Sequence, residues 1–203
     1  MFLLKNDLLK RLLAEFVGTY LLALTVLHVT TGNFTSIAPF AIAGVLMVLV
    51  YLLGGVSGAH FNPSVTIGLL VVRKISAVDA LVNIIGQIAG AVVALEFSAK
   101  MLGVEMTIHS ALSTEWFYEM MGAFVLCFAV AGVVHGVVSK SLSGAVIGLG
   151  LFVGIIISER VSGGVLNPAL VIGMGNLDFT YLISPIIGGI AANLLALFVF
   201  SKN

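Results

Sequence analysis

Two asparagines carry the most informative pattern in this sequence, because each lies in the same short motif. Residues 57–64 read Ser-Gly-Ala-His-Phe-Asn-Pro-Ser, and residues 162–169 read Ser-Gly-Gly-Val-Leu-Asn-Pro-Ala. Asn is a favoured N-cap, and Pro is tolerated at the first helical position because its missing N–H would be unpaired there anyway. Asn62 and Asn167 are therefore each predicted to begin a helix while their amide N–H groups donate to other partners.

The composition indicates a membrane protein. Hydrophobic residues make up 60% of the chain and charged residues only 9%, with a formal net charge of zero. Soluble domains carry about 25% charged residues. A bilayer requires about 20 apolar helical residues per crossing. Six segments are long enough, or nearly so, at approximately residues 12–31, 38–56, 80–103, 117–138, 143–158 and 180–200.

Two further apolar segments, 62–72 and 167–175, are too short to span, and each begins with an Asn-Pro pair. We interpret both as half-helices that enter the membrane from loops. Non-helical backbone is tolerated at such depth only inside protein or beside water. Both half-helices are therefore predicted to lie in the middle of the bundle.

The chain is predicted to form one domain, residues 1–203, made of two inverted repeats at approximately 8–104 and 112–203. A Glu in the first span and a Glu in the fourth keep nearly the same spacing as the two motif asparagines. Each half holds three spans and a half-helix, and an odd number of spans makes the second half insert upside down. The predicted fold class is an all-α membrane protein with six transmembrane helices and two re-entrant half-helices.

The distribution of basic residues predicts that both termini face the cytoplasm, in the plasma (cytoplasmic) membrane. Lys and Arg are enriched on the cytoplasmic side of membrane proteins. With the N-terminus inside, the outer side carries only Lys100 and Arg160. The cytoplasmic side then carries Lys5, Lys10, Arg11, Arg73, Lys74, Lys140 and Lys202.

The predicted meeting point of the half-helices favours neutral molecules over cations. Each helix N-terminus has a partial positive charge, and two that face each other repel a proton or a metal ion. The residues assigned to this centre are Asn62, Pro63, Ser64, Asn167, Pro168 and Ala169. Backbone carbonyls before each motif are expected to provide acceptors along the rest of the path, at Gly58, Ala59, His60, Gly163, Gly164 and Val165.

The chain resembles the major intrinsic protein family, the aquaporins and aquaglyceroporins. The resemblance rests on the two Asn-Pro motifs, on the Glu-x-x-Gly openings of spans one and four, and on the x-x-Gly elements that begin at Gln87 and Pro185. It covers nearly the whole chain. It implies a six-helix bundle with one pore per subunit, a homotetramer, and passive conduction of water or small neutral solutes.

The chain departs from the family pattern at the outer constriction. The family usually has Arg three residues after the second motif Asn, and this chain has Leu170. Counting within the resemblance places the other filter residues at Ile42, Ile155 and Gly164, so the implied selectivity filter has no side-chain donor. Either it is wide and apolar and passes less polar or larger neutral solutes, or it is an apolar plug that conducts water poorly. A register error in these counts is the remaining alternative.

Two charged neighbours precede the second motif. Arg160 is expected either to swing towards the outer vestibule and restore a cation barrier, or to be an interfacial residue balanced by Glu159.

His60, in the first motif, is expected to line the pore near its cytoplasmic mouth, to gate it with pH, or to be a neutral hydrogen-bonded loop residue.

Glu15 and Glu119 lie inside predicted spans, where a charge costs at least about 2.5 kcal/mol, so each requires internal partners. The resemblance implies that they accept hydrogen bonds from the re-entrant loops and hold the carbonyls in place. The alternative is a proton-relay role.

The sequence has no glycine-rich phosphate loop, no metal-ligand cluster and no nucleophile paired with a base. We therefore expect no enzyme activity, cofactor or metal. The favoured function is a passive channel for water or small uncharged solutes. The alternatives are a proton-coupled secondary transporter and a poorly conducting structural membrane protein of the same fold. Expected partners are other copies of the chain, the lipid bilayer and small neutral solutes, and not nucleic acid.

Overall fold

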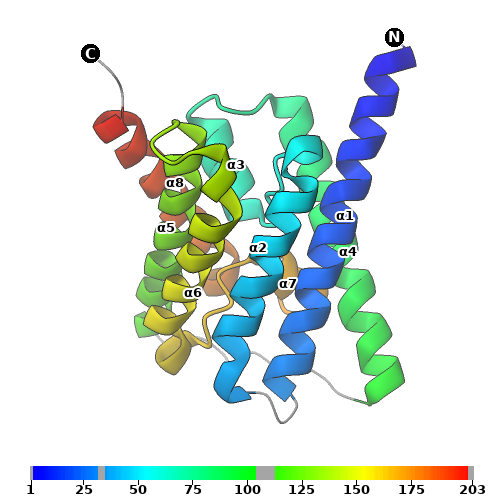
Figure 1. Cartoon of the computed structure of the whole chain (residues 1–203). Helices are drawn as coiled ribbons and strands as arrows, with labels where there is room; N and C mark the ends of the chain where they lie inside the picture. Colours follow the sequence, from blue (N-terminus) through cyan, green and yellow to red (C-terminus); the bar gives the residue numbers. More distant parts are fainter. Residues whose placement is uncertain (1, 32–34, 104–112, 201–203) are drawn as a thin grey trace.

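The computed structural model describes residues 2–31, 35–103 and 113–200, and its regular elements there are all helices. They are α1 (Phe2–Thr31), η1 (Thr35–Ile37), α2 (Ala38–Ser57), α3 (Pro63–Val71), α4 (Ala77–Leu102), α5 (Ser113–Val134), η2 (Lys140–Leu142), α6 (Ser143–Ser162), α7 (Pro168–Gly173) and α8 (Phe179–Phe200). The long helices form a bundle in which α1 begins and α8 ends on the same side (Figure 1).

Six of these helices, α1, α2, α4, α5, α6 and α8, are long and apolar enough to cross a membrane. The six predicted spans are therefore confirmed, but boundaries differ at α1, α5 and α6, and α5 lies four residues earlier than predicted at both ends. Helix α1 begins at Phe2 rather than near residue 12, and α6 continues to Ser162 rather than ending near residue 158. The additional turns carry charged residues, which lower the hydropathy of a segment but can reach water when they lie at a helix end.

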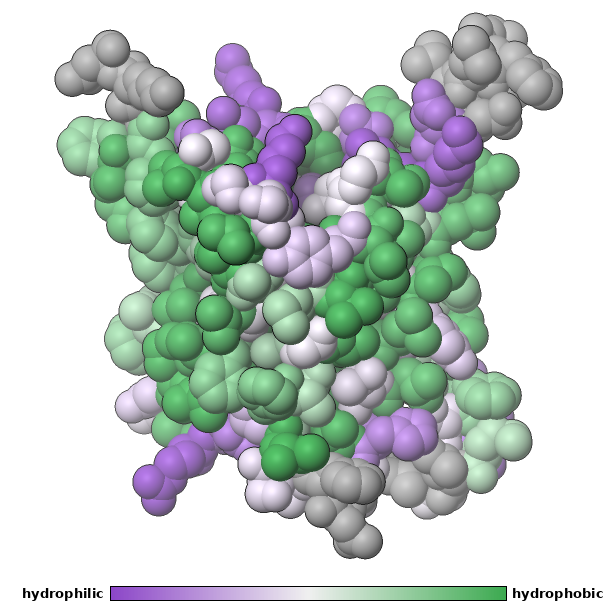
Figure 2. All heavy atoms as spheres, viewed as in Figure 1, coloured by the Kyte–Doolittle hydropathy of each residue, from purple (hydrophilic) through white to green (hydrophobic). Residues whose placement is uncertain are grey.

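A belt of apolar side chains surrounds the bundle. Phe40, Leu52 and Phe198 are 72%, 69% and 82% exposed. Figure 2 shows hydrophobic residues over the middle of the face in view and hydrophilic residues gathered towards its two ends. Soluble monomers rarely expose apolar patches larger than a few hundred Å², so this belt is suited to contact with lipid.

The two short helices α3 and α7 begin at the Asn-Pro motifs, as predicted. The side chain of Asn62 accepts a hydrogen bond from the backbone N–H of Ser64, and that of Asn167 accepts one from Ala169. Helix α3 packs against α8, α7 packs against α4, and the two short helices contact each other. Each short helix therefore packs against the last long helix of the opposite half of the chain.

Close helix crossings at glycine hold the long helices together in pairs. In the α1–α4 pair, Gly90 faces the backbone carbonyl of Phe16, and in the α5–α8 pair, Gly188 faces the carbonyl of Met120. A Cβ at either glycine would collide with that carbonyl. Small residues at such crossings let the helix backbones approach closely. Gly18 of α1 and Gly122 of α5 likewise leave room for Phe61 and Leu166 of the two loops.

Candidate functional site

The two motif asparagines exchange hydrogen bonds across the centre of the bundle. Asn62 Nδ2 donates to the carbonyl of Leu166 at 2.9 Å, and Asn167 Nδ2 donates to the carbonyl of Phe61 at 2.9 Å. Each Oδ1 meanwhile caps its own short helix. An amide NH₂ has two hydrogens, so each asparagine keeps a second N–H. Both residues line one cavity, and that N–H is therefore the donor that they can offer to its contents.

The loop before the first motif has strained backbone that a buried carboxylate holds in place. Ala59 and Phe61 have φ of 53° and 50°, in the left-handed region that costs a non-glycine residue about 1–2 kcal/mol. Glu15 accepts hydrogen bonds from the backbone N–H groups of His60 at 3.0 Å and Phe61 at 2.8 Å. Its two oxygens also accept from Ser57 Oγ at 2.6 Å and from Gln87 Nε2 at 2.7 Å.

Glu119 makes the matching contacts to the second loop. It accepts from Ser162 Oγ at 2.7 Å and from the backbone N–H groups of Val165 at 3.0 Å and Leu166 at 2.7 Å. Leu166 has φ of 52°, as its counterpart Phe61 does. Glu15 accepts four hydrogen bonds and Glu119 three. The fourth donor to Glu15 is the side chain of Gln87, and the corresponding residue in the second half is Pro185, which has no side-chain donor.

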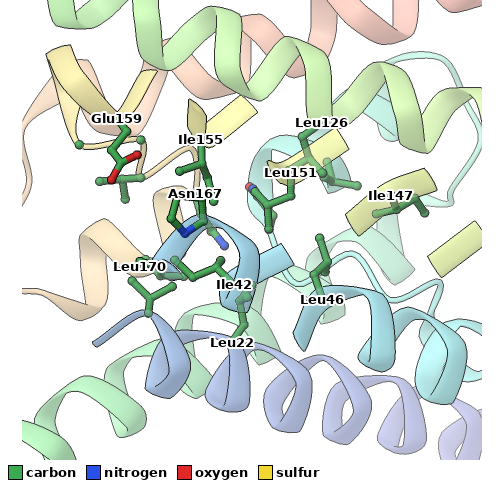
Figure 3. Close-up of a pocket in the computed structure, with 18 of the residues that line it drawn as sticks. Leu22, Ile42, Leu46, Leu126, Ile147, Leu151, Ile155, Glu159, Asn167 and Leu170 are labelled. Atoms are coloured by element: carbon green, nitrogen blue, oxygen red, sulfur yellow. The ribbon is translucent and has the colours of Figure 1, made fainter. Parts of the chain in front are cut away.

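The four predicted constriction residues line one narrow cavity of about 90 Å³. Ile42 on α2, Ile155 on α6, Gly164 in the second loop and Leu170 on α7 all contribute to its wall. Figure 3 shows Ile42, Ile155 and Leu170 close to Asn167. Gly164 has φ of 65°, a conformation that strains any other residue. The structure therefore brings these residues together beside the crossed asparagines.

Leu170 also has a packing role. Its side chain is only 2% exposed and belongs to a buried cluster with Leu27 of α1 and Leu95 of α4. It therefore anchors the short helix α7 against two long helices while it forms part of the cavity wall.

The charged residue at the end of this cavity away from the start of α1 is Glu159 and not Arg160. Glu159 lines the cavity, whereas Arg160 is exposed and is not among the described residues that line it. The ion pairs of the described residues do not include one between Glu159 and Arg160. In Figure 3, Glu159 lies at one end of the row of labelled side chains and Ile147 at the other.

A second, wider cavity of about 530 Å³ lies at the end of the bundle where α1 begins. Its lining includes the cations Arg11, Lys74 and Lys140. His60 and Ile147 line both cavities, so the two spaces adjoin there. His60 therefore lies at the junction between the wide cavity and the narrow one.

A chain of hydrogen bonds determines which nitrogen of His60 carries its proton. Arg11 Nη1 donates to Asn83 Oδ1 at 3.2 Å and the guanidinium pairs with Asp79 at 3.2 Å. Because Arg can only donate, Asn83 Oδ1 faces it and Nδ2 faces His60 Nδ1 at 3.2 Å. His60 Nδ1 then faces a donor, which favours the neutral ring with its proton on Nε2, and Thr66 Oγ1, 3.0 Å away, can complete this arrangement by donating to Nδ1. A second proton on Nδ1 would place two donors against each other.

Comparison with known proteins decides the family. The sequence profile described as "Major intrinsic protein" matches residues 3–196. The chain belongs to the major intrinsic protein family. A relative, Glycerol uptake facilitator protein-like 6 of Lactiplantibacillus plantarum, is 31% identical over 96% of this chain and 100% of its own length. Nodulin-26 of Glycine max is 30% identical over 90% of this chain and 75% of its own length.

The fold of this major intrinsic protein is also found in a solved structure. The X-ray structure of the aquaglyceroporin from Plasmodium falciparum superposes with a TM-score of 0.78, covers 95% of this chain and 96% of that one, and is 19% identical. Aquaporins and glycerol facilitators are channels and not enzymes. The predicted family, fold class and lack of enzyme activity are thus confirmed, and the chain is an integral membrane channel protein.

Sequence reasoning missed part of the polar network in this major intrinsic protein. Asn83 and Arg11 orient His60, and Thr66 Oγ1 lies 3.0 Å from His60 Nδ1 while it accepts from Gln87 Nε2 at 2.9 Å. Asn83 and Gln87 are four residues apart on α4 and therefore lie on one face of it. Two buried amides at that spacing inside an apolar span were the signal that could have identified this network.

Solute flux through this major intrinsic protein is expected to be flat between about pH 5 and pH 8, because His60 stays neutral. Burial of the ring and the nearby charge of Arg11 both oppose its protonation. Asn83→Asp would place a carboxylate oxygen against Nδ1 and is expected to make flux pH-dependent in this range. Flux is measured in vesicles at matched inner and outer pH. Wild-type flux that varies with pH, and ceases to vary in His60→Gln, would contradict the neutral assignment.

Proposed function

We propose that this chain is a passive channel for water and small uncharged solutes, and that the path runs through the two adjoining cavities. The observation that carries the proposal is the crossed pair of asparagines. Each has one N–H bonded to the opposite loop and a second on the wall of the narrow cavity. Two fixed donors suit a neutral molecule with an acceptor oxygen. Together with the opposed helix N-termini they disfavour a cation.

Unused backbone carbonyls support the same path. No hydrogen bond within the described part of the chain uses the carbonyl oxygens of Gly58, Ala59 or His60, or those of Gly163, Gly164 or Val165. These residues all lie along the two cavities. Ala59 and His60 are buried, where a carbonyl normally finds a partner, and we propose that these six oxygens accept hydrogen bonds from the permeating molecules.

We propose that Ile42, Ile155, Gly164 and Leu170 form an apolar outer constriction that is wide enough for small solutes. The packing of Leu170 against α1 and α4 favours this reading over a closed plug, because a side chain held in that cluster is less free to close the lumen. The name of the relative from Lactiplantibacillus plantarum suggests glycerol as one of the solutes.

The remaining features of the proposal concern assembly and topology. We propose two inverted repeats, at approximately 8–104 and 112–203, supported by the matching contacts of Glu15 and Glu119. Residues 104–112 and 201–203 lie outside the described part of the chain. We also propose a homotetramer in the plasma membrane with cytoplasmic termini. The basic residues at the end where α1 begins support this orientation; Lys202 and the side chain of Lys5 lie outside the described part.

Stopped-flow light scattering on proteoliposomes tests the channel directly. Water, glycerol and urea are each expected to cross faster than through protein-free vesicles of the same lipid. Fluxes that do not exceed those of the empty vesicles would reject an open channel. They would favour the alternative of a poorly conducting structural membrane protein of the same fold. A flux that depends on an imposed pH gradient would favour the alternative of a proton-coupled transporter.

Ile42→Phe is expected to lower glycerol permeability by about tenfold, equivalent to about 1.4 kcal/mol in the barrier, because it adds a ring inside the narrow cavity. Water is expected to lose less, since it is smaller. Val48→Phe is the matched control, because Val48 lies on the same helix but is 52% exposed on its outer face. Both rates are measured in the same proteoliposomes. Equal effects of the two variants would show that Ile42 is not at the constriction.

A further inference from the structure

The narrow cavity has a charged residue at its outer end. Glu159 is the one residue with a formal charge among the described residues that line this cavity. It follows Ile147, Leu151 and Ile155 at intervals of four along α6, and all four line the cavity. Residues at this spacing lie on one helix face. The backbone of Glu159 therefore lies about 6 Å along the helix axis beyond that of the constriction residue Ile155.

This carboxylate is free to accept hydrogen bonds. Glu159 is exposed, and no ion pair among the described residues includes it. Lys100, another cation at this end of the bundle, lies 3.5 Å from Glu96. The adjacent Arg160 is outside the described lining of the cavity. Within the described part of the chain the carboxylate is therefore not engaged in an ion pair.

The outer stretch of the cavity offers acceptors and lacks side-chain N–H donors. Its acceptors are the Glu159 carboxylate and the unused carbonyls of Gly163 and Gly164. Side-chain N–H groups on the lining occur only deeper, at Asn167, Asn62 and His60. The hydroxyl groups of a polyol can donate to these acceptors, but their oxygens meet no side-chain N–H donor in this stretch. An amide has one carbonyl oxygen and several N–H donors, so it leaves fewer groups unpaired.

We propose that Glu159 makes the outer mouth a docking site for small planar amides of the urea class and so determines a preference for them over polyols. Two parallel N–H groups of a urea match the two oxygens of a carboxylate, as the two N–H groups of a guanidinium do. A flexible polyol must fix its rotors to form two such bonds. The inference rests on the proposed channel function, which it refines.

The preference is tested by the ratio of urea to glycerol permeability in the same proteoliposomes, since a ratio cancels differences in the amount of protein inserted. Glu159→Gln is expected to lower this ratio by roughly fivefold, the upper range for an interaction with an exposed charge. Glu159→Asp keeps a carboxylate and is expected to retain most of the ratio. Glu96→Gln is the matched control, because it removes the same charge at the same end of the bundle but away from both cavities.

Guanidinium supplies a second readout, because it has the shape of urea but carries a charge that the centre of the pore excludes. Guanidinium at millimolar concentration is expected to slow urea entry in the wild type and to have less effect in Glu159→Gln. An unchanged urea-to-glycerol ratio in Glu159→Gln, or equal losses in Glu159→Gln and Glu96→Gln, would overturn the docking site. Wild-type glycerol and water fluxes no greater than those of empty vesicles would instead reject the channel itself.

Discussion

Replacing Glu15 with Gln is expected to destabilise the folded channel by about 3 kcal/mol and to abolish solute flux. Glu15 is fully buried, and four donors converge on its two oxygens. An amide has one acceptor oxygen, so two of these donors would face its NH₂ group. Two of the four donors are the backbone N–H groups of His60 and Phe61, in the loop whose residues Ala59 and Phe61 have left-handed backbone. Loss of these bonds would therefore release the strained loop that presents Asn62.

Glu119→Gln is expected to show the same defect to a smaller degree. Three donors converge on Glu119, so a well-oriented Gln would leave only the N–H of Leu166 facing its NH₂ group. Thermal unfolding in detergent, followed by circular dichroism, together with water flux in vesicles, measures both effects. Glu96→Gln is the control, since Glu96 is exposed and paired with Lys100. Equal stability of Glu15→Gln and Glu96→Gln would contradict the role of Glu15 in holding the loop.

Gly188→Ala is expected to lower the stability of the folded protein by about 2–3 kcal/mol, the range for overpacking a tight contact. Gly188 is fully inside the α5–α8 crossing, where an added Cβ would collide with the carbonyl of Met120 and approach the backbone of Phe124. Backbone cannot move aside as a flexible side chain does, so the two helices must separate. Gly90→Ala is expected to have a similar effect on the α1–α4 crossing.

Gly44→Ala provides the matched control for these crossings, because a Cβ at Gly44 meets nothing within 4 Å. It lies in the interior of α2, where Ala is at least as favourable as Gly, so no loss of stability is expected. Unfolding temperature in one detergent is measured for all three variants. If Gly188→Ala unfolds at the same temperature as Gly44→Ala, the α5–α8 crossing tolerates a side chain and the packing argument fails.

The spans and the two short helices could be predicted because their signals are local. Hydropathy over about 20 residues identifies a span, and an Asn-Pro pair marks a helix start. The same local signals misplaced the start of α1 and the end of α6, where charged residues interrupt the apolar pattern within a continuous helix. They also led us to consider Arg160 at the outer mouth, whereas Glu159 lines the cavity there.

The sequence by itself determined the six-span architecture, the two short helices and the residues of the two Asn-Pro motifs, but not the network of Arg11, Asn83 and His60. It also identified the buried glutamates, because a charge inside a span requires partners. Only the tertiary structure showed that Asn62 and Asn167 each donate a hydrogen bond to the loop before the other's motif. It also showed that Asn83 lies against Nδ1 of His60 and so favours a proton on Nε2. It also decided which of two adjacent charges faces the cavity. Neighbouring residues on a helix differ by about 100° in direction, so the rotation of α6 within the bundle had to be known before Glu159 could be distinguished from Arg160.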